Sequence, residues 1–97
     1  MNKYELTHVA KCPNNNQKDV YNITIESEET IMVEDINEFF HENRIAKMYQ
    51  EQWADALAER FPDAKICFAC EHQGIMITTE RGKEWLTHKF QATRHHT

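Results

Sequence analysis

The chain has 97 residues, of which 40% are apolar and 28% charged, a composition typical of one small globular domain. The formal net charge of -5 argues against broad binding to a phosphate backbone, so any contact with nucleic acid would have to be local. The sequence has no run of the roughly 20 apolar residues that span a membrane, no signal-peptide core at its start and an odd number of cysteines, which predicts a soluble protein of the reducing cytoplasm.

The first two predicted elements are strands. Residues 4–9 alternate between outward and inward side chains with the period of two that is typical of a strand. After a polar loop, Tyr21, Ile23 and Ile25 share one face of a second strand.

Two helices are predicted to follow an acidic break at residues 26–29. The first helix is expected to begin near Asp35, because Ile36, Phe39 and Phe40 recur at helical spacing. The second helix carries an apolar stripe on one face and ends before a proline. The stripe and the proline are Tyr49, Trp53, Ala56, Leu57, Phe61 and Pro62.

A hairpin is predicted to close the sheet. Ile66, Phe68 and Cys70 alternate with residues that face the opposite way, as in a strand. Gly74 then provides a break, and residues 75–79 alternate again as the returning strand.

These elements predict an α+β fold, in which both helices cover one face of a four-stranded antiparallel sheet. We expect a single domain over residues 1–97, with a core at about 4–80 and a C-terminal extension at 81–97. Within the extension, residues 84–90 are expected to form a short helix or a docked strand, and residues 91–97 to fray. The uncovered face of such a small sheet commonly lines a barrel built from several subunits, so a homo-oligomer is expected.

The polar loop that begins at Cys12 carries a candidate nucleophile. Cys12 follows Lys11, whose charge favours the thiolate, the form of the thiol that attacks. Asp19 lies seven residues later, where an Asn-rich loop that folds back would bring its carboxyl group near the sulfur. The pair would then supply a nucleophile and a proton-transfer group. The same spacing also fits a partly buried loop cysteine and a surface aspartate, because a Cys-to-Asp pair has no specific physical signature.

Four polar residues are candidates for binding a planar ring. Glu51, at the expected start of the second helix, could accept two parallel N–H bonds from a guanidine-like ring edge, or it could only stabilise its helix. Glu34 is either a second substrate contact or part of the acidic pair that starts the first helix. Gln50, beside Glu51, and His72, before the glycine break, are further candidate contacts.

A zinc site is an alternative use of the cysteines. Cys67, Cys70 and His72 offer thiolates and an imidazole within a short stretch. Strand alternation turns Cys67 and Cys70 to opposite faces, so Cys67 reads as a small core residue. A mononuclear site would then use Cys12, Cys70 and His72, although our expectation is that the protein holds no metal.

The loop sequence resembles that of a known enzyme family. Cys12 and Pro13, followed by Gln17 and Asp19, are similar to the Cys-Pro loop of the 7-cyano-7-deazaguanine reductase (QueF) family of tunnelling-fold (T-fold) proteins. The resemblance covers about residues 4–80 and includes the second helix and the glycine-containing turn before the last strand.

This resemblance implies a reaction and an architecture. It implies that Cys12 attacks the nitrile carbon of 7-cyano-7-deazaguanine (preQ0) to form a thioimidate, while Asp19 shuttles protons. It also implies a tunnelling fold that binds a planar purine-like or pterin-like ring at a subunit interface, through a glutamate in the place of Glu51. The assembly expected from it is a pentameric or decameric ring.

Two departures from the family pattern point to a subfamily. NADPH-dependent members continue the Val-Glu pair with a segment rich in Ser, Lys and Leu, whereas residues 33–39 read Val-Glu-Asp-Ile-Asn-Glu-Phe here. That segment has no lysine, and its charge would repel a dinucleotide phosphate. The second departure is Gln50, where the reductases have histidine.

What remains resembles the short QueF-like amidinotransferases, which need no cofactor. In them ammonia attacks the thioimidate and gives an archaeosine-type amidine, with the base free or in nucleic acid; tRNA and DNA acceptors both stay open. Three alternatives remain: an NADPH-dependent reductase of queuosine biosynthesis, a zinc-dependent cyclohydrolase-like T-fold enzyme, and a purine- or pterin-binding protein without catalysis.

Overall fold

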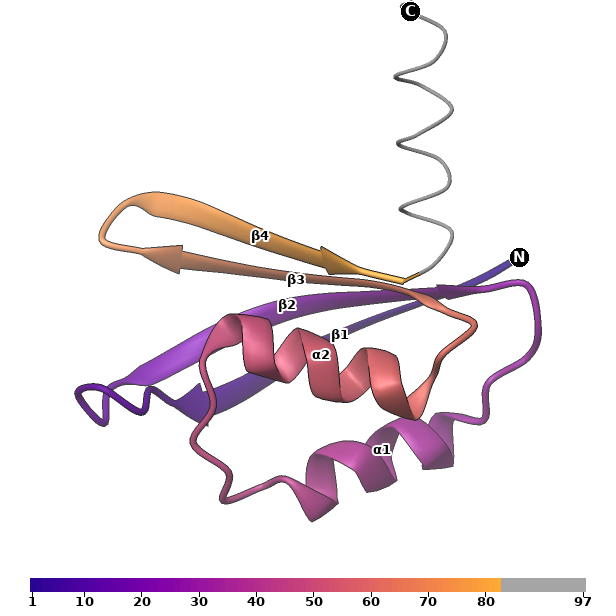
Figure 1. Cartoon of the computed structure of the whole chain (residues 1–97), viewed down its shortest axis with the longest axis horizontal. Coiled ribbons are helices and arrows are strands. Elements are labelled where there is room, and N and C mark those ends of the chain that lie inside the picture. The colour runs from indigo at the N-terminus through magenta and orange to yellow at the C-terminus, as the bar shows by residue number, and fades with distance from the viewer. Residues whose placement is uncertain (83–97) are drawn as a thin grey trace, which may run out of the picture.

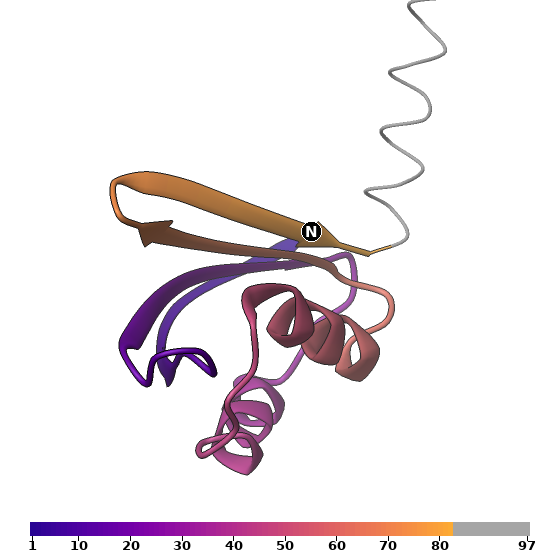
Figure 2. The ribbon, with the colours of Figure 1, turned by 60° about the vertical axis from the view of Figure 1, so that its left-hand side comes forward.

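The strands and helices follow one another in the predicted order. A computed structural model describes residues 1–82 and shows an α+β fold of two strands, two helices and two strands (Figure 1). The strands form one antiparallel sheet in the order β1-β2-β3-β4, and both helices lie on the same face of it (Figures 1 and 2). The predictions for residues 84–90 and 91–97 lie outside the described residues.

The opening hairpin is longer than the sequence pattern suggested. β1 (Asn2–Lys11) pairs along its whole length with β2 (Lys18–Ser27). The pattern located only residues 4–9, because both ends of β1 are polar and backbone pairing rather than side-chain burial defines them. Tyr21, Ile23 and Ile25 are buried on one face of β2, as predicted.

The first helix, α1 (Val33–Glu42), begins two residues before Asp35. Ile36, Phe39 and Phe40 are its buried residues, which confirms the predicted helical face. Glu34 and Asp35 lie in its first turn, where carboxylates interact favourably with the helix dipole.

The second helix, α2 (Gln50–Arg60), buries a slightly different stripe from the predicted one. Trp53 and Leu57 are fully buried as expected, but the neighbouring buried residues are Gln50 and Ala54. Ala56 is only partly buried. The difference arises because a polar residue, Gln50, occupies the buried face of the first turn, and apolar periodicity cannot detect it.

The closing hairpin is confirmed. β3 (Lys65–His72) pairs with β4 (Ile75–Arg81), and His72 is opposite Ile75. The two residues between them, Gln73 and Gly74, have φ values of 52 and 82 degrees. Positive φ at both positions is typical of a type I′ turn, whose twist matches that of the strands.

The core lies between the sheet and both helices, and several aromatic rings pack within it. Tyr21 of β2 contacts Phe68 of β3 edge to face, with ring centroids 5.6 Å apart. Trp53 stacks on Phe40 of α1 at 6.2 Å, and His8 lies against the same Phe40 ring at 4.6 Å. These contacts fix α2 against the sheet and thereby position its first turn.

No helix within residues 1–82 is long and apolar enough to cross a membrane. In the described part of the chain, the face of the sheet opposite the helices is covered by no further layer (Figure 2). The partners that this face would meet in the expected homo-oligomer remain a prediction.

Candidate functional site

A small pocket lies where three turns of the chain meet. The β1–β2 loop, the first turn of α2 and the β3–β4 turn gather at the same end of the molecule (Figure 1). The pocket between them has a volume of about 170 Å³. It is lined by Cys12, Pro13, Asp19, Tyr21, Tyr49, Gln50, Glu51, His72 and Ile77.

Five residues singled out in the sequence line this one pocket, although they come from four separate elements. They are Cys12, Asp19, Gln50, Glu51 and His72. Glu34 does not line it. Glu34 lies in the first turn of α1, at the opposite end of the helical layer from the first turn of α2 (Figure 1).

The β1–β2 loop folds back on itself and holds Cys12 in place. The Cys12 N–H donates to the Gln17 carbonyl at 2.8 Å, and the Asn16 N–H donates to the Cys12 carbonyl at 3.0 Å. Asn16 has a φ of 61 degrees, a left-handed conformation that asparagine tolerates better than most residues. The Gln17 N–H donates to the Asn15 side-chain oxygen at 3.0 Å. These bonds explain why the Asn-rich stretch brings Cys12 and Asp19 to the same pocket.

Asp19 is surrounded by groups that can exchange or share a proton. Its side chain is 13% exposed, and its Oδ1 lies 3.8 Å from Nδ1 of His72. Burial, followed by the nearby Asp19 charge, raises the pKa of the Tyr21 hydroxyl above its usual range. Tyr21 therefore stays protonated beside Asp19.

The three cysteines differ in their surroundings. Cys70 is 2% exposed, and burial and the Asp19 charge raise the pKa of its thiol. Burial likewise raises the pKa of Cys67, which points to the uncovered face of the sheet opposite Glu80. Cys12 is half-buried and is the cysteine that lines the pocket, so it is the thiol that a ligand there would meet.

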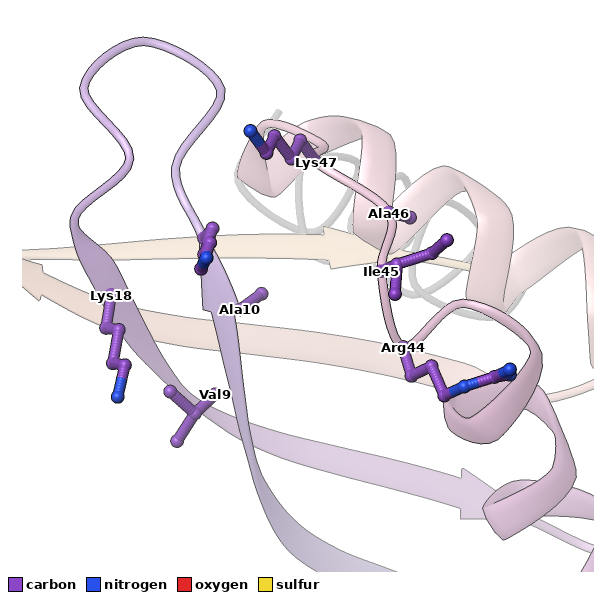
Figure 3. Close-up of a pocket in the computed structure, with 8 residues that line it drawn as sticks. Val9, Ala10, Lys18, Arg44, Ile45, Ala46 and Lys47 are labelled. Atoms are coloured by element: carbon purple, nitrogen blue, oxygen red, sulfur yellow. The ribbon is translucent and has the colours of Figure 1, made fainter.

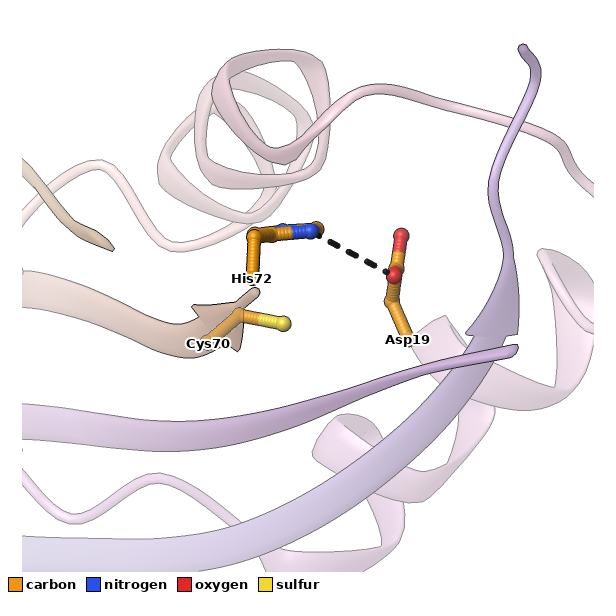
Figure 4. A group of neighbouring side chains, drawn as sticks. All are labelled: Asp19, Cys70 and His72. Carbon is orange, nitrogen blue, oxygen red and sulfur yellow. Dashed lines mark ion pairs between the residues drawn. The ribbon is translucent and has the colours of Figure 1, made fainter. Parts of the chain in front are cut away.

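Asp19, Cys70 and His72 form a group with three different donor atoms (Figure 4). One ligand atom from each lies within 4.8 Å of the others, and oxygen, sulfur and nitrogen are the donors that zinc accepts. The structure therefore joins Cys70 and His72 as the sequence suggested, but with Asp19 rather than Cys12 as the third member.

Gln50 ties the start of α2 to the closing hairpin. Its side chain is nearly buried, and its Nε2 group lies within hydrogen-bond distance of the Phe68 carbonyl at 3.1 Å, the Ile77 carbonyl at 3.0 Å and the Thr79 hydroxyl at 3.1 Å. The amide donors are thus used within the protein. Its Oε1 is buried without a partner in the described chain.

Glu51 and Tyr49 form the exposed side of the pocket. Glu51 is the second residue of α2 and is exposed, and the positive end of the helix dipole stabilises its carboxylate. Tyr49 caps the helix through its N–H, which bonds to Gln52 at 2.8 Å, and half of its side chain remains exposed. Sequence reasoning assigned Tyr49 to the core stripe and missed its place at the pocket.

Comparison with protein-family models, curated proteins and solved structures gave no match to this chain.

Proposed function

We propose that the pocket binds a planar 7-deazaguanine-type base that carries a nitrile, and that Cys12 forms a covalent thioimidate with it. The observation that supports this most is that a half-buried thiol, a carboxyl group and an exposed helix-start carboxylate line one small pocket, at Cys12, Asp19 and Glu51. The proposal assigns the chain to the tunnelling fold and to the QueF-like enzymes.

The proposed first step is addition of the thiol to the nitrile. The Cys12 sulfur forms a bond to the nitrile carbon, one carbon–nitrogen π bond breaks, and the nitrogen takes a proton. Asp19 would deliver that proton and recover one from the thiol. The nearby His72, with the protonated Tyr21, would orient the Asp19 carboxyl group for this transfer.

The proposed second step is attack by ammonia. Ammonia adds to the thioimidate carbon, the carbon–sulfur bond breaks, and the Cys12 thiol is restored with its proton. The product is an amidine of the archaeosine type, and the step involves no oxidation or reduction. We favour ammonia over hydride because the acidic first turn of α1, with Glu34 and Asp35, would repel the phosphates of NADPH where it meets the pocket of a second subunit.

The base would be held by its edge and its face. The Glu51 carboxylate would accept two N–H bonds from the guanidine-like edge of the ring, and such paired bonds give orientation as well as affinity. The half-exposed Tyr49 ring offers a surface on which a flat base can stack. Glu34 would contact the base only from a second subunit, in a pocket shared within a cytoplasmic ring-shaped oligomer.

A zinc-dependent, cyclohydrolase-like reaction is a second candidate. It is favoured by the Asp19, Cys70 and His72 group, whose three donors could hold a zinc ion with one position open. Metal analysis of protein purified without chelator separates the two functions. Stoichiometric zinc that is lost in His72→Ala would support this candidate, and zinc-free protein that still forms the adduct would exclude it.

The adduct itself is the test of the main proposal. Incubation with the free nitrile base should raise the intact mass of the protein by the mass of one base, because addition releases nothing. Cys12→Ala should abolish the gain, whereas the matched variant Cys67→Ala, on the opposite face of the sheet, should keep it. An adduct that survives in Cys12→Ala, or no adduct in the unmodified protein, would contradict the proposal.

A further inference from the structure

A second, positively charged groove lies on the other side of the β1–β2 loop. It has a volume of about 330 Å³ and runs between the end of the β1–β2 hairpin and the linker that joins α1 to α2 (Figure 3). Four of its lining residues are cations and none is acidic. The cations are Lys11, Lys18, Arg44 and Lys47.

This concentration of charge is unusual for an acidic chain. The whole protein has 11 lysines and arginines and a net charge of -5, yet four of the cations line this one groove. Lys11 and Lys18 are directly opposite each other across β1 and β2, an arrangement that costs stability because like charges repel. A bound anion would relieve that repulsion.

The part of the chain that the structure describes supplies no counter-charge for the groove. Within residues 1–82, none of the four cations forms an ion pair with a carboxylate. The Arg44 guanidinium donates to the His41 carbonyl at 2.8 Å, a contact that leaves its charge uncompensated. Unpaired cations therefore border the groove on both walls, Lys11 and Lys18 on the hairpin and Arg44 and Lys47 on the linker, although the Lys18 and Arg44 side chains extend away from each other (Figure 3).

The groove adjoins the pocket through the same stretches of chain. Lys11 immediately precedes Cys12, and Lys18 immediately precedes Asp19. On the opposite wall, Lys47 is two residues before Tyr49, whose half-exposed ring lines the pocket. A positively charged track beside an exposed aromatic ring is the combination with which proteins bind single-stranded nucleic acid.

We infer that this groove binds the phosphodiester backbone of a single-stranded or looped nucleic acid. Four cations can neutralise only a few phosphates, so the contact is local and compatible with the net negative charge of the chain. A base next to the bound phosphates would lie near the pocket. That placement of the base rests on the proposed function, whereas backbone binding by the groove does not.

The test measures binding of a fluorescent single-stranded oligonucleotide of ordinary bases by anisotropy over a range of salt concentrations. The affinity should fall as salt rises, with a slope of log K against log salt of about -0.7 for each phosphate neutralised. The double variant Lys18→Gln, Lys47→Gln should bind more weakly, and its slope should be less steep by about 1.4, since two contacts are lost. Lys3→Gln is the matched control, because Lys3 is an exposed lysine on β1 that pairs with Glu5 outside the groove, and it should bind like the unmodified protein.

Several results would overturn the inference. They are an affinity that is independent of salt, no binding at low salt, an equal loss in Lys3→Gln, or equal affinity for a single mononucleotide or for polyglutamate. Thermal melting of each variant shows whether it is folded, and Lys18→Gln and Lys47→Gln alone replace the double variant if it is not. Because the probe carries no nitrile, the result does not depend on whether Cys12 forms an adduct.

Discussion

At the scale of single residues, the pocket depends on the different environments of chemically similar groups. Cys12 is half-buried at the pocket, whereas Cys70 lies in the core, where burial raises the pKa of its thiol. The Asp19 side chain is largely buried beside His72 and the protonated Tyr21, whereas Glu51 is exposed at a helix start. The proposed function accordingly gives the two carboxyl groups different tasks, proton transfer for Asp19 and ring binding for Glu51.

Replacement of Asp19 should slow the proposed chemistry without preventing binding of the base. We expect Asp19→Asn to reduce the rate of adduct formation by about 10²-fold to 10⁴-fold, the usual contribution of general acid catalysis. The rate is measured by intact mass at timed intervals. Asp63→Asn, which alters a residue outside the pocket, is the control and should leave the rate unchanged. Equal rates in Asp19→Asn and the unmodified protein would remove Asp19 from the mechanism.

The buried Cys70 thiol should make stability fall at alkaline pH. Its pKa in the folded protein is raised above the ordinary value of 9.0. Its contribution is therefore fully present below pH 9.0 and decreases as the pH rises from 9.0 to the folded pKa, because the unfolded chain loses its proton first.

Cys70→Ala should reduce the loss of stability above pH 9.0, by up to about 1.4 kcal/mol for each pH unit until the folded pKa is reached. The measurement is the free energy of unfolding in urea at each pH. Tyr21→Phe is the comparison, since its own effect should begin only above the ordinary tyrosine value of 10.0. An unchanged pH dependence in Cys70→Ala would show that the thiol is not the cause.

At the scale of elements, the sequence predicted the four strands and both helices because each follows a simple period. Tyr21, Ile23 and Ile25 alternate on a strand, and Trp53 and Leu57 repeat on a helix. The ends of β1 and the true buried face of α2 were not predictable from apolar spacing, because backbone pairing fixes the former and a buried polar residue, Gln50, fixes the latter.

Only part of the site could be predicted for the same reason. The types and spacing of Cys12, Asp19 and Glu51 suggested a role, but nothing local in the sequence brings α2 beside the β1–β2 loop. The roles of Tyr21 and Tyr49 were missed because each looked like an ordinary member of a core stripe. The sequence predicted Cys12 as the third member of the candidate metal group, whereas the structure has Asp19 there. The difference depends on side-chain directions, which spacing does not determine.

Gln50 should be important for attaching α2 to the sheet. Gln50→Leu leaves the Phe68 and Ile77 carbonyls without their side-chain donor, and we expect a loss of about 1–3 kcal/mol in the free energy of unfolding. Gln52→Ala, on the exposed side of the same helix, removes only a cap and should cost at most about 1 kcal/mol. Urea unfolding measures both, and equal losses in the two variants would contradict the anchoring role of Gln50.

At the scale of the whole molecule, the proposed function requires more than one chain. The second carboxylate, Glu34, lies at the far end of the helical layer from the pocket, and the face of the sheet opposite the helices is uncovered within residues 1–82 (Figures 1 and 2). Light scattering after gel filtration should therefore give the mass of an oligomer, that is, two or more times the 11.6 kDa of one chain. A monomer at micromolar concentration would contradict a pocket shared between subunits.

The central claim is that Cys12 is the residue that becomes covalently attached to the nitrile base. The most direct measurement is peptide mapping by tandem mass spectrometry after incubation of the whole protein with the base and rapid digestion. We predict that the added mass lies on Cys12, in the peptide from the β1–β2 loop, and that added ammonia removes it with release of an amidine. An added mass on Cys67 or Cys70, or none on any cysteine, would contradict the account.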